Sequence, residues 1–595
     1  MRQSVRRNLK WRKVIMKKRL LSVLLSVSLL LVLCACGGGS SNTPAADSGS
    51  APASETAQTS EKAPETPAAP ASDAEDSTML PADSAAAEPT DPTEIDASGL
   101  YPVFDELTTV TAFLNIAPWA SAYIGPNAEF ENAYAILAAE DYTNVHLDVD
   151  WSDPDTYNEK LNLLVAANDL PNFTRSLGRL YSTGEDGLIE DGLAVDLYPY
   201  FEEYAPNYYA ILESNAKFKE DTTSSSGVTT AMYSYTEIPL YTRGPIVRKD
   251  MLDAVNKEIP TTVDELHDVA LALKNEYGVK SAVVSPKMTA DAYAGADFIS
   301  SNDVLMTWWN IDGTVTAAVT LDSNYEWAKE MKQWNDEGLF VESWYNPAPF
   351  YDFDVLNDQL AIAYGPYNLT SDSYRAAAAS PDTCEIYPMA NVVLKEGDTI
   401  KTQNNAYGGK GDGDWTITTA DEDIIPQLVS YVNWFFTKEG SMISNFGTLD
   451  ETYTIDDNGD VHYTDLILKD PNGYGSMAVY AIFTNNNDNP FYFRMERTEL
   501  TYDNEVEATV YDTWLSNMTS EYICNYQMTT EETTRYNALS TDVMTVVQEH
   551  MTKFMTGDMD LTEDTWQAFQ DKLESLGISE MRDIVQTAFD RTNNA

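Results

Sequence analysis

Residues that bind metals or form disulfides are scarce in this sequence. Its 595 residues include only four cysteines and four histidines, and no His and Cys cluster has the spacing of a zinc site. We therefore expect no metal and no cofactor. Two of the cysteines lie close to the N-terminus, which leaves Cys384 and Cys524. A disulfide framework is excluded, whereas a single bridge between these two stays open.

Positive charge is scarce as well. The chain has 37 Lys and Arg against 94 Asp and Glu, which gives a formal net charge of −57. Nine of the 37 basic residues lie in the first 36 positions, where no acidic residue occurs, so the remainder is more acidic still. A negative field of this size repels the phosphates of nucleic acids and of anionic lipids, which excludes DNA and RNA as partners.

The apolar segment near the N-terminus is too short to span a membrane. It runs from Leu20 to Leu33 behind Lys17-Lys18-Arg19, whereas a spanning helix needs roughly 20 apolar residues. A basic start, a short apolar run and a small residue before the cleavage site are typical of a secretory signal peptide, here residues 1–36. The ending Leu33-Cys34-Ala35-Cys36 resembles the lipobox of bacterial lipoproteins, which implies acylation, such as by palmitate, at Cys36. The alternative is an uncleaved anchor, and either places the body on the extracellular face of the membrane.

Behind the signal the composition divides the chain into a tether and a folded body. Residues 37–98 are almost wholly Ala, Pro, Ser, Thr, Asp, Glu and Gly, so they cannot bury enough apolar surface to fold. We predict a disordered tether there. Residues 99–595 exceed what one hydrophobic core usually supports, and we expect at least two lobes.

The body alternates strand-like and helix-like segments. Buried strands are predicted over Val110–Leu114 and Val145–Val149, and helices over Ala128–Glu140 and Pro154–Ala167. Thr262, followed three residues later by a glutamate, has the pattern of a helix start. This alternation favours an α/β fold. No nucleophile elbow, HExxH motif or phosphate-binding loop occurs, so we expect a protein that is not an enzyme.

Five motifs occur in an order that is known from one protein family. They are Asn168-Asp169-Leu170-Pro171, Asp191–Leu197, Arg248–Asp253 with Ile259–Leu266, Tyr364-Gly365-Pro366-Tyr367, and a C-terminal set between Phe554 and Arg591. With these motifs the chain resembles the family 1 type of extracellular solute-binding lipoproteins of carbohydrate ABC importers. The C-terminal set resembles the LplA-like subgroup. Two departures from the family pattern are Thr174 and Tyr367, the latter in place of Trp.

The resemblance implies a fold and a function. The fold is α/β, periplasmic-binding-protein-like (type II), with two discontinuous lobes and a hinge between them. Lobe 1 would comprise about 99–238 and a returning segment near 390–460. Lobe 2 would comprise about 239–389 and part of the C-terminal helices. The function would be capture of a sugar or oligosaccharide by a lipid-anchored monomer and delivery to the membrane subunits of an ABC permease.

Candidate ligand-binding residues follow from the chemistry of sugars, which pack against aromatic rings and hydrogen-bond to planar side chains. Some follow predicted strands, whose carboxyl ends form ligand sites in open α/β sheets. Others lie in a predicted loop behind the glycine-rich residues 408–413, or at the stacking position that the family resemblance implies. The candidates are Trp119, Arg175, Trp308, Trp309, Tyr367, Asp414 and Trp415. Of the two adjacent tryptophans, one should lie in the core and the other should line the cleft.

Three alternatives stay open. Calcium could be bound at Asp153–Asp155 or Asp456–Asp460, but neither has a twelve-residue loop with a closing Glu, and the second is better explained as a hairpin turn. A peptide or another non-carbohydrate solute could replace the sugar. A surface glycoside hydrolase is the third alternative. Such enzymes use two carboxylates, and a chain with this many acidic residues always offers a pair, so the presence of a pair does not discriminate.

Overall fold

The computed structural model describes residues 91–115, 134–152, 154–236, 243–294, 308–345, 351–400, 410–468, 490–502, 504–519, 524 and 526–593. The predicted signal with Cys36, residues 37–90 of the predicted tether, and Trp119 lie outside these ranges. The last residues of that tether are folded and not disordered, since Thr93 is buried and the Asn207 side-chain amide donates to the Pro92 carbonyl oxygen (2.9 Å). In the described ranges, no helix combines the length and the apolar character needed to cross a bilayer. Cys384 and Cys524 are both buried and free, so the bridge between them does not form.

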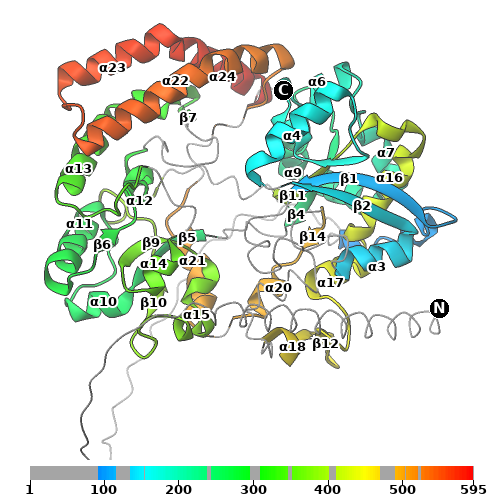
Figure 1. Ribbon diagram of the computed structural model, residues 1–595, viewed down its shortest axis with the longest axis horizontal. Coiled ribbons are helices and arrows are strands. Elements are labelled where there is room, and N and C mark those ends of the chain that lie inside the picture. The colour runs from blue at the N-terminus through cyan, green and yellow to red at the C-terminus, as the bar shows by residue number, and fades with distance from the viewer. Residues whose placement is uncertain are drawn as a thin grey trace, which may run out of the picture. The chain divides into compact units, whose positions relative to one another are not determined.

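Six strands form the first sheet, in the order β14-β4-β11-β3-β1-β2. Their bounds are Thr108–Asn115 (β1), Val145–Ser152 (β2), Phe173–Arg175 (β3), Ala231–Thr236 (β4), Lys410–Ile417 (β11) and Tyr492–Phe493 (β14). The pairs β1/β2, β1/β3 and β4/β14 are parallel, whereas β11 runs antiparallel to both of its neighbours, β3 and β4. The two strands predicted from the sequence lie within β1 and β2, and the second begins with β2 at Val145 (Figure 1).

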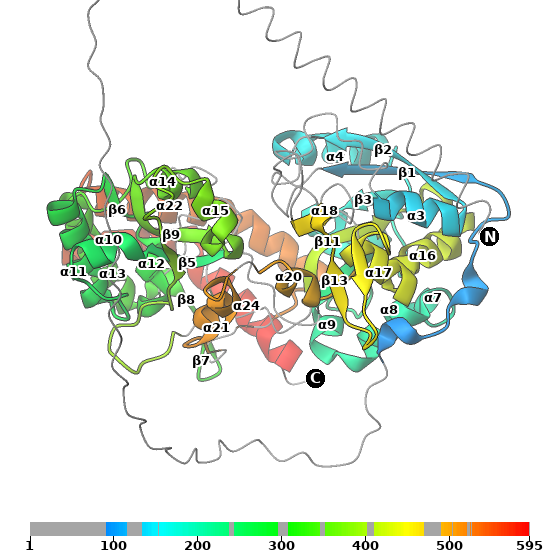
Figure 2. The same cartoon turned by 90° about the horizontal axis from the view of Figure 1, so that it is seen from below.

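Helices cover both faces of the first sheet because successive side chains of β1 point to opposite faces. Ala112 and Leu114 pack into the core that includes helix α3 (Tyr134–Thr143). Phe113 packs instead with Tyr157 and Leu161 of α4 (Pro154–Ala167), which has the predicted bounds. Figure 2 shows α4 on one side of β1 and β2 and α3 on the other. The remaining helices of this region are α5 (Leu177–Leu180), α6 (Gly184–Glu190), α7 (Tyr198–Tyr204), α8 (Pro206–Ser214), α9 (Ala216–Asp221), α16 (Ile425–Asn433) and α17 (Lys438–Phe446).

Four strands form the second sheet, in the order β10-β5-β9-β6. They are Arg243–Arg248 (β5), Ser281–Val283 (β6), Leu360–Pro366 (β9) and Ile386–Pro388 (β10), with β6 and β9 parallel. Helices α10 (Lys249–Ala254), α11 (Val263–Ala272), α13 (Asp322–Asp336) and α14 (Asp352–Leu356) belong to this region. The predicted start of α11 is confirmed, because the Thr262 hydroxyl accepts from the Glu265 backbone N–H (3.3 Å) and the Glu265 carboxylate accepts from that of Thr262 (3.2 Å).

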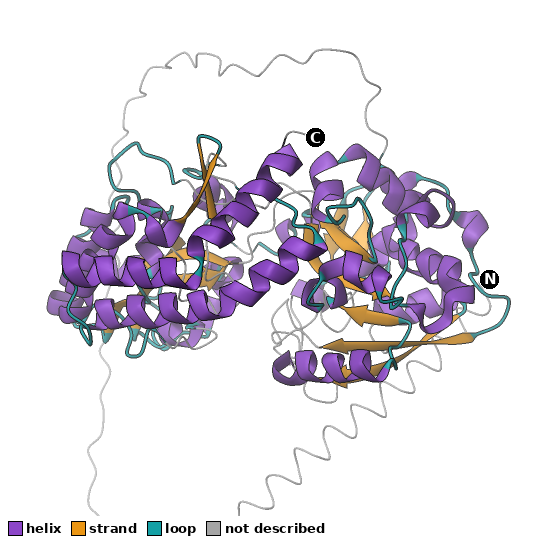
Figure 3. Ribbon diagram, turned by 90° about the horizontal axis from the view of Figure 1, so that it is seen from above, coloured by secondary structure: helices purple, strands orange, loops and turns teal. Residues whose placement is uncertain are grey.

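Two hairpins and three long helices complete the described chain. The hairpin β7 (Trp308–Ile311)–β8 (Thr314–Ala317) turns at Asp312-Gly313, where both residues have positive φ. The hairpin β12 (Tyr453–Ile455)–β13 (Val461–Tyr463) contains the turn predicted at Asp456–Asp460. The C-terminal helices α22 (Thr530–Thr556), α23 (Glu563–Leu576) and α24 (Ile578–Asn593) pack on one another, and α22 also packs on α13. Figure 3 shows how helices surround the strands of both sheets.

Candidate functional site

The strands of the first sheet bring several polar residues to one edge. In the parallel pair β1/β2, Asn115 lies opposite Ser152, and Arg175 ends the parallel strand β3. Because β11 is antiparallel to β3 and β4, its amino end lies at the same edge as their carboxyl ends. The carboxyl edge of an open α/β sheet is where ligands bind, so the residues at this edge are candidates for a ligand site.

Arg175 is held at this edge by a buried tyrosine. The Tyr157 hydroxyl accepts from the Arg175 backbone N–H (3.0 Å) and donates to its carbonyl oxygen (2.7 Å), and the Tyr157 ring stacks on Phe113 with centroids 4.9 Å apart. Burial raises the pKa of Tyr157, so the phenol stays neutral and keeps its donor. The half-buried guanidinium of Arg175 donates through Nη1 to Asn115 Oδ1 at 3.4 Å. The sheet therefore positions the predicted residue Arg175 beside an amide that the sequence analysis missed.

Asp414 lies next to Arg175, but not in the loop that we predicted. The structure corrects this expectation, since Asp414 and Trp415 both lie in β11, which pairs with β3 on one side and β4 on the other. The carboxylate of Asp414 accepts from the Ser176 backbone N–H (2.8 Å) and hydroxyl (2.9 Å). Trp415 points to the opposite face, where it is fully buried against Phe173, with ring centroids 4.9 Å apart. Trp415 is therefore a core residue and offers no open ring face.

A second carboxylate on the same face of the sheet was not predicted. Glu185 of α6 accepts from the Thr230 backbone N–H (3.0 Å) and from the hydroxyl of Tyr233, which lies opposite Asp414 in the β4/β11 register. The Glu185 side chain passes so close to Gly178 that a Cβ there would lie 2.7 Å from its Cγ. Burial and the nearby carboxylates of Glu185 and Asp414 hold the pKa of Tyr233 well above its usual range. The face thus holds neutral phenol donors beside fixed carboxylates.

The corresponding edge of the second sheet holds an ion pair. Arg243, the first residue of β5, pairs in register with Pro366, the last residue of β9. Its guanidinium donates to both carboxylate oxygens of Asp352, at 3.1 and 2.5 Å, and to the Tyr364 carbonyl at 2.9 Å. The Lys287 ammonium lies 5.9 Å from the centroid of the Tyr364 ring. This edge therefore presents donors, acceptors and an aromatic ring.

Tyr367, the predicted stacking platform, follows β9 directly. It is only 8% exposed, and its ring lies 5.8 Å from that of Tyr511, which in turn contacts Trp514. Trp514 covers Gly244 so closely that a Cβ there would lie 2.3 Å from its ring. The hydroxyl of Tyr511 is buried and has no hydrogen-bond partner in the described part of the chain. Tyr367 thus belongs to an aromatic stack beside the edge, with little of its own ring exposed.

Trp308 and Trp309 differ from the prediction that one of them lines a cleft. Each is only 2% exposed. The Trp308 Nε1–H donates to the Tyr536 hydroxyl (2.9 Å), and the Trp309 Nε1–H donates to the Ala294 carbonyl (3.0 Å). Both faces of the hairpin are therefore covered, the Trp308 face by α22 and the Trp309 face by the segment around residue 294. Strand alternation predicted the two directions correctly, but only the tertiary packing shows that both are buried.

No metal site is present among the residues that the structure describes. There, no group of three or more His, Cys, Asp or Glu side chains is arranged to hold an ion. Asp456 instead stabilises the β12–β13 turn, where its carboxylate accepts from the backbone N–H groups of Asn458 (2.8 Å) and Asp460 (3.0 Å).

Comparison with known proteins gives partial sequence matches. No family model matches the chain. A stretch of 143 residues is 29% identical to the polygalacturonan/rhamnogalacturonan-binding protein YtcQ of Bacillus subtilis, covering 24% of this chain and 27% of that protein. A stretch of 154 residues is 24% identical to lipoprotein LipO of the same organism, covering 26% and 29%. The chain therefore matches less than a third of the length of either curated relative.

Solved structures match over most of the chain. The alginate-binding protein AlgQ2 aligns with a TM-score of 0.67 and 20% identity, covering 82% of this chain and 99% of that one. An HMO-binding solute-binding protein from Bifidobacterium longum infantis aligns with a TM-score of 0.61, 16% identity and coverages of 82% and 99%. The S. pneumoniae ABC-transporter substrate-binding protein FusA in complex with kestose has the same TM-score and identity, with coverages of 82% and 100%. At such identities the likeness shows the fold: this chain has the two-lobed α/β fold of periplasmic solute-binding proteins.

Proposed function

We propose that this protein captures a sugar or oligosaccharide between its two lobes and delivers it to an ABC permease. The observation that carries the proposal is the placement of polar and aromatic groups at the carboxyl edges of two separate sheets. Arg175 and Asp414 lie at the first edge, and Arg243, Asp352 and Tyr364 lie at the second. Guanidinium and carboxylate groups supply the donors and acceptors that sugar hydroxyls require.

The path of the chain supports a hinge between these edges. It leaves β4 at Thr236 and enters β5 at Arg243, so seven peptide steps, or at most about 25 Å, separate the two strands. It returns from the second region to β11, and it leaves again after β14 toward α21 (Val510–Leu515). All three passages use the carboxyl edge of the first sheet. Connections that share one edge, one of them as short as the β4–β5 passage, are compatible with hinge closure around a ligand.

Bounds for the lobes and the residues of the site are part of the proposal. Lobe 1 comprises about 99–238 and the returning segment near 390–460, to which the pairing of β14 with β4 adds Tyr492–Phe493, whereas the bridge between Val393 and Thr262 assigns the start of that segment to lobe 2. Lobe 2 comprises about 239–389 and part of the C-terminal helices. Arg175, Asp414 and Tyr367 remain in the proposed site, and Trp119, four residues beyond the end of β1, stays a candidate by its sequence position alone. Trp415 supports the site by packing on Phe173 of β3, whereas Trp308 and Trp309 are core residues of the β7–β8 hairpin and leave the proposed site.

The ligand class is supported by what the similar proteins are named for. Polygalacturonan, rhamnogalacturonan, alginate, HMO and kestose appear in the names of the proteins compared above. These proteins are binding proteins, and we extend that role to this chain in place of hydrolysis. Incubation of the purified body with the same glycans should leave them intact, and chain shortening detected by mass spectrometry would favour a glycoside hydrolase.

Calorimetric titration of the body with pectic, alginate, milk-type and fructan oligosaccharides tests the capture itself. We expect saturable binding of at least one class, together with a smaller radius of gyration in solution scattering as the lobes close. Arg175→Ala should weaken this binding at least tenfold, whereas the exposed control Arg582→Ala should not change it. Saturable binding of peptides without any glycan would overturn the carbohydrate assignment.

The remaining parts of the proposal concern the cell surface. The mature protein is a monomer of the LplA-like subgroup, acylated at Cys36 and held at the extracellular face of the membrane by its tether. LipO, a lipoprotein by name, supports this part. Replacement of Cys36 by Ala should release the protein into the culture medium, and retention at the membrane would instead support an uncleaved anchor.

A further inference from the structure

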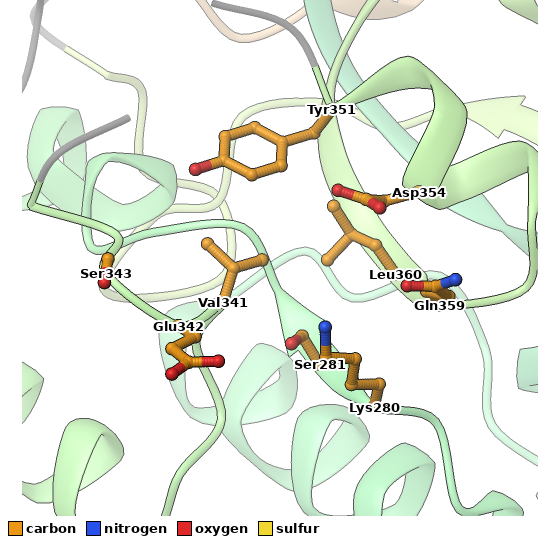
Figure 4. Close-up of a pocket in the computed structure, with 9 residues that line it drawn as sticks. All are labelled: Lys280, Ser281, Val341, Glu342, Ser343, Tyr351, Asp354, Gln359 and Leu360. Carbon is orange, nitrogen blue, oxygen red and sulfur yellow. The ribbon is translucent and has the colours of Figure 1, made fainter. Parts of the chain in front are cut away.

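The second sheet carries a pocket at the edge that the proposed capture site does not use. The pocket has a volume of about 320 Å³ (Figure 4). Two of its lining residues, Lys280 and Gln359, directly precede the parallel strands β6 and β9, so it lies at their amino ends. Arg243 and Tyr364 lie at the other end of β9, a strand of roughly 20 Å. The pocket is therefore built within one lobe and does not depend on closure.

Polar side chains from four segments converge on this pocket. Figure 4 shows Lys280, Glu342, Asp354 and Gln359 around it, with the Tyr351 ring above and Leu360 and Val341 between them. Ser281 and Ser343 add hydroxyls, and Ser343 has the left-handed backbone conformation (φ 58°) that is uncommon outside glycine. The loop is thus tightly turned where it presents Glu342 and Ser343 to the pocket.

The polar groups of the pocket are not engaged with one another. The side chains of Lys280, Glu342, Asp354 and Gln359 make no hydrogen bond or ion pair with any residue that the structure describes. At the carboxyl edges, by contrast, Arg243 is paired with Asp352 and Asp414 with Ser176. The pocket therefore keeps donors and acceptors that are available to a ligand.

We infer that this pocket binds a monosaccharide-sized polyol without negative charge. Its volume is at the small end of ligand pockets. A hydroxyl both donates and accepts, so a polyol suits a mixture of ammonium, amide and carboxylate groups. The Tyr351 ring with Leu360 and Val341 offers apolar surface for the C–H face of a sugar ring. Two carboxylates face one ammonium in the lining, so an anionic sugar is repelled.

Ligand-detected NMR titration of the purified body with methyl galactoside, galactosamine and galacturonate tests the inference. We expect saturable binding of the first two and at least fivefold weaker binding of galacturonate. Tyr351→Ala and the double change Asp354→Asn with Gln359→Ala should each weaken the binding at least fivefold. Tyr345→Ala is the matched control, since this tyrosine of the same loop is 43% exposed and does not line the pocket. Thermal melting checks that each variant is folded. If Tyr351→Ala is unfolded, the double change tests the inference in its place.

The site can be separated from the proposed capture site by further variants. Arg175→Ala and Asp414→Ala should leave monosaccharide binding unchanged, because both residues lie in the other sheet. Absence of saturable binding, a preference for galacturonate, or loss of binding in Arg175→Ala but not in Tyr351→Ala would each overturn the inference. Failure of oligosaccharide capture alone would leave it standing, since the pocket lies within one lobe.

Discussion

The two sheets hold their polar groups in place by different means. In the first sheet, neutral groups position the polar residues through hydrogen bonds. The Tyr157 hydroxyl bonds to the backbone of Arg175, and the Ser176 backbone N–H donates to the Asp414 carboxylate. In the second, guanidinium groups pair with carboxylates, as Arg243 does with Asp352 and Arg248 with two aspartates. Hydrogen bonds between a backbone and a neutral group are insensitive to pH and salt, whereas charged pairs are not.

The largest loss of stability is expected at Arg248, a charged residue that is buried at the end of β5 in the second sheet. Arg248 is 1% exposed and donates to Asp250 (2.8 and 2.7 Å), to Asp358 (2.6 Å) and to the Val355 carbonyl (2.7 Å). Arg248→Met removes one side of this network and leaves the carboxylates uncompensated, so we expect a loss of about 3–5 kcal/mol in the free energy of unfolding. Urea denaturation measures it. The exposed pair Arg535–Glu580 is the control, and an equal loss in Arg535→Met would contradict the role of burial.

One glycine in each region allows the two regions to be compared by their packing, Gly244 in β5 of the second sheet and Gly178 in helix α5 beside the first. Gly244→Ala brings a Cβ to 2.3 Å from the rigid ring of Trp514, and we expect a loss of about 1–3 kcal/mol in the free energy of unfolding. Gly178→Ala brings one to 2.7 Å from the flexible side chain of Glu185, which can move aside at a smaller cost. Gly99→Ala meets no atom within 4 Å and serves as the control. A larger loss of stability in Gly178→Ala than in Gly244→Ala would show that the Glu185 side chain is held rigidly and cannot move aside.

Tyr157→Phe tests the uncharged anchoring of the first sheet. It removes the two hydrogen bonds to the Arg175 backbone while the ring can still stack on Phe113. Because the N–H and C=O groups of Arg175 would lose this partner, we expect about 1–2 kcal/mol of lost stability together with weaker oligosaccharide binding. Denaturation and calorimetry measure the two effects. Tyr277→Phe, at a position 42% exposed, should change neither.

The smallest effect is the pH dependence of stability that we expect from the Arg248–Asp358 ion pair beside the second sheet. Burial alone would raise the pKa of Asp358, but hydrogen bonds from Ser380 and Arg248 hold it below its ordinary value of 3.8. A lowered pKa in the folded state stabilises the fold above pH 3.8, and this contribution is lost as the pH falls through the folded pKa. Asp358→Asn should therefore be less stable than the unchanged protein near neutral pH, with the difference shrinking below pH 4 in urea titrations. A difference that stayed constant to pH 3 would count against the ion pair.

Local patterns in the sequence predicted much of the fold. The strands around Val110 and Val145, helix α4 and the capping box at Thr262 depend on residues close together in the chain, and each is confirmed. The hairpin turn predicted at Asp456–Asp460 is confirmed for the same reason. The loop predicted to contain Asp414 and Trp415 is wrong, because Asp414 pairs with β4 and Trp415 pairs with both β3 and β4, although the β4 register shifts between Lys410 and Asp414.

The polar groups of the candidate site were harder to predict. Arg175 could be found because it lies at the carboxyl end of a strand, although it is the last residue of β3 and not in a loop, and the same rule would have pointed to Asn115 and Ser176. Glu185 had no such signal, since its role depends on passing Gly178 to reach Tyr233 on a distant strand. Trp308, Trp309 and Trp415 were chosen for their chemistry, whereas their burial depends on elements far away in the sequence.

By itself the sequence determined the alternation of strands and helices, the helix starts and the hairpin turns, because these depend on interactions between near neighbours in the chain. The composition likewise determined the strong negative charge. Only the tertiary structure decided which polar residues share a sheet edge, which tryptophans are buried, and that a polar pocket lies at the amino ends of β6 and β9. These features depend on strand register and on packing between distant segments, and no local pattern encodes them.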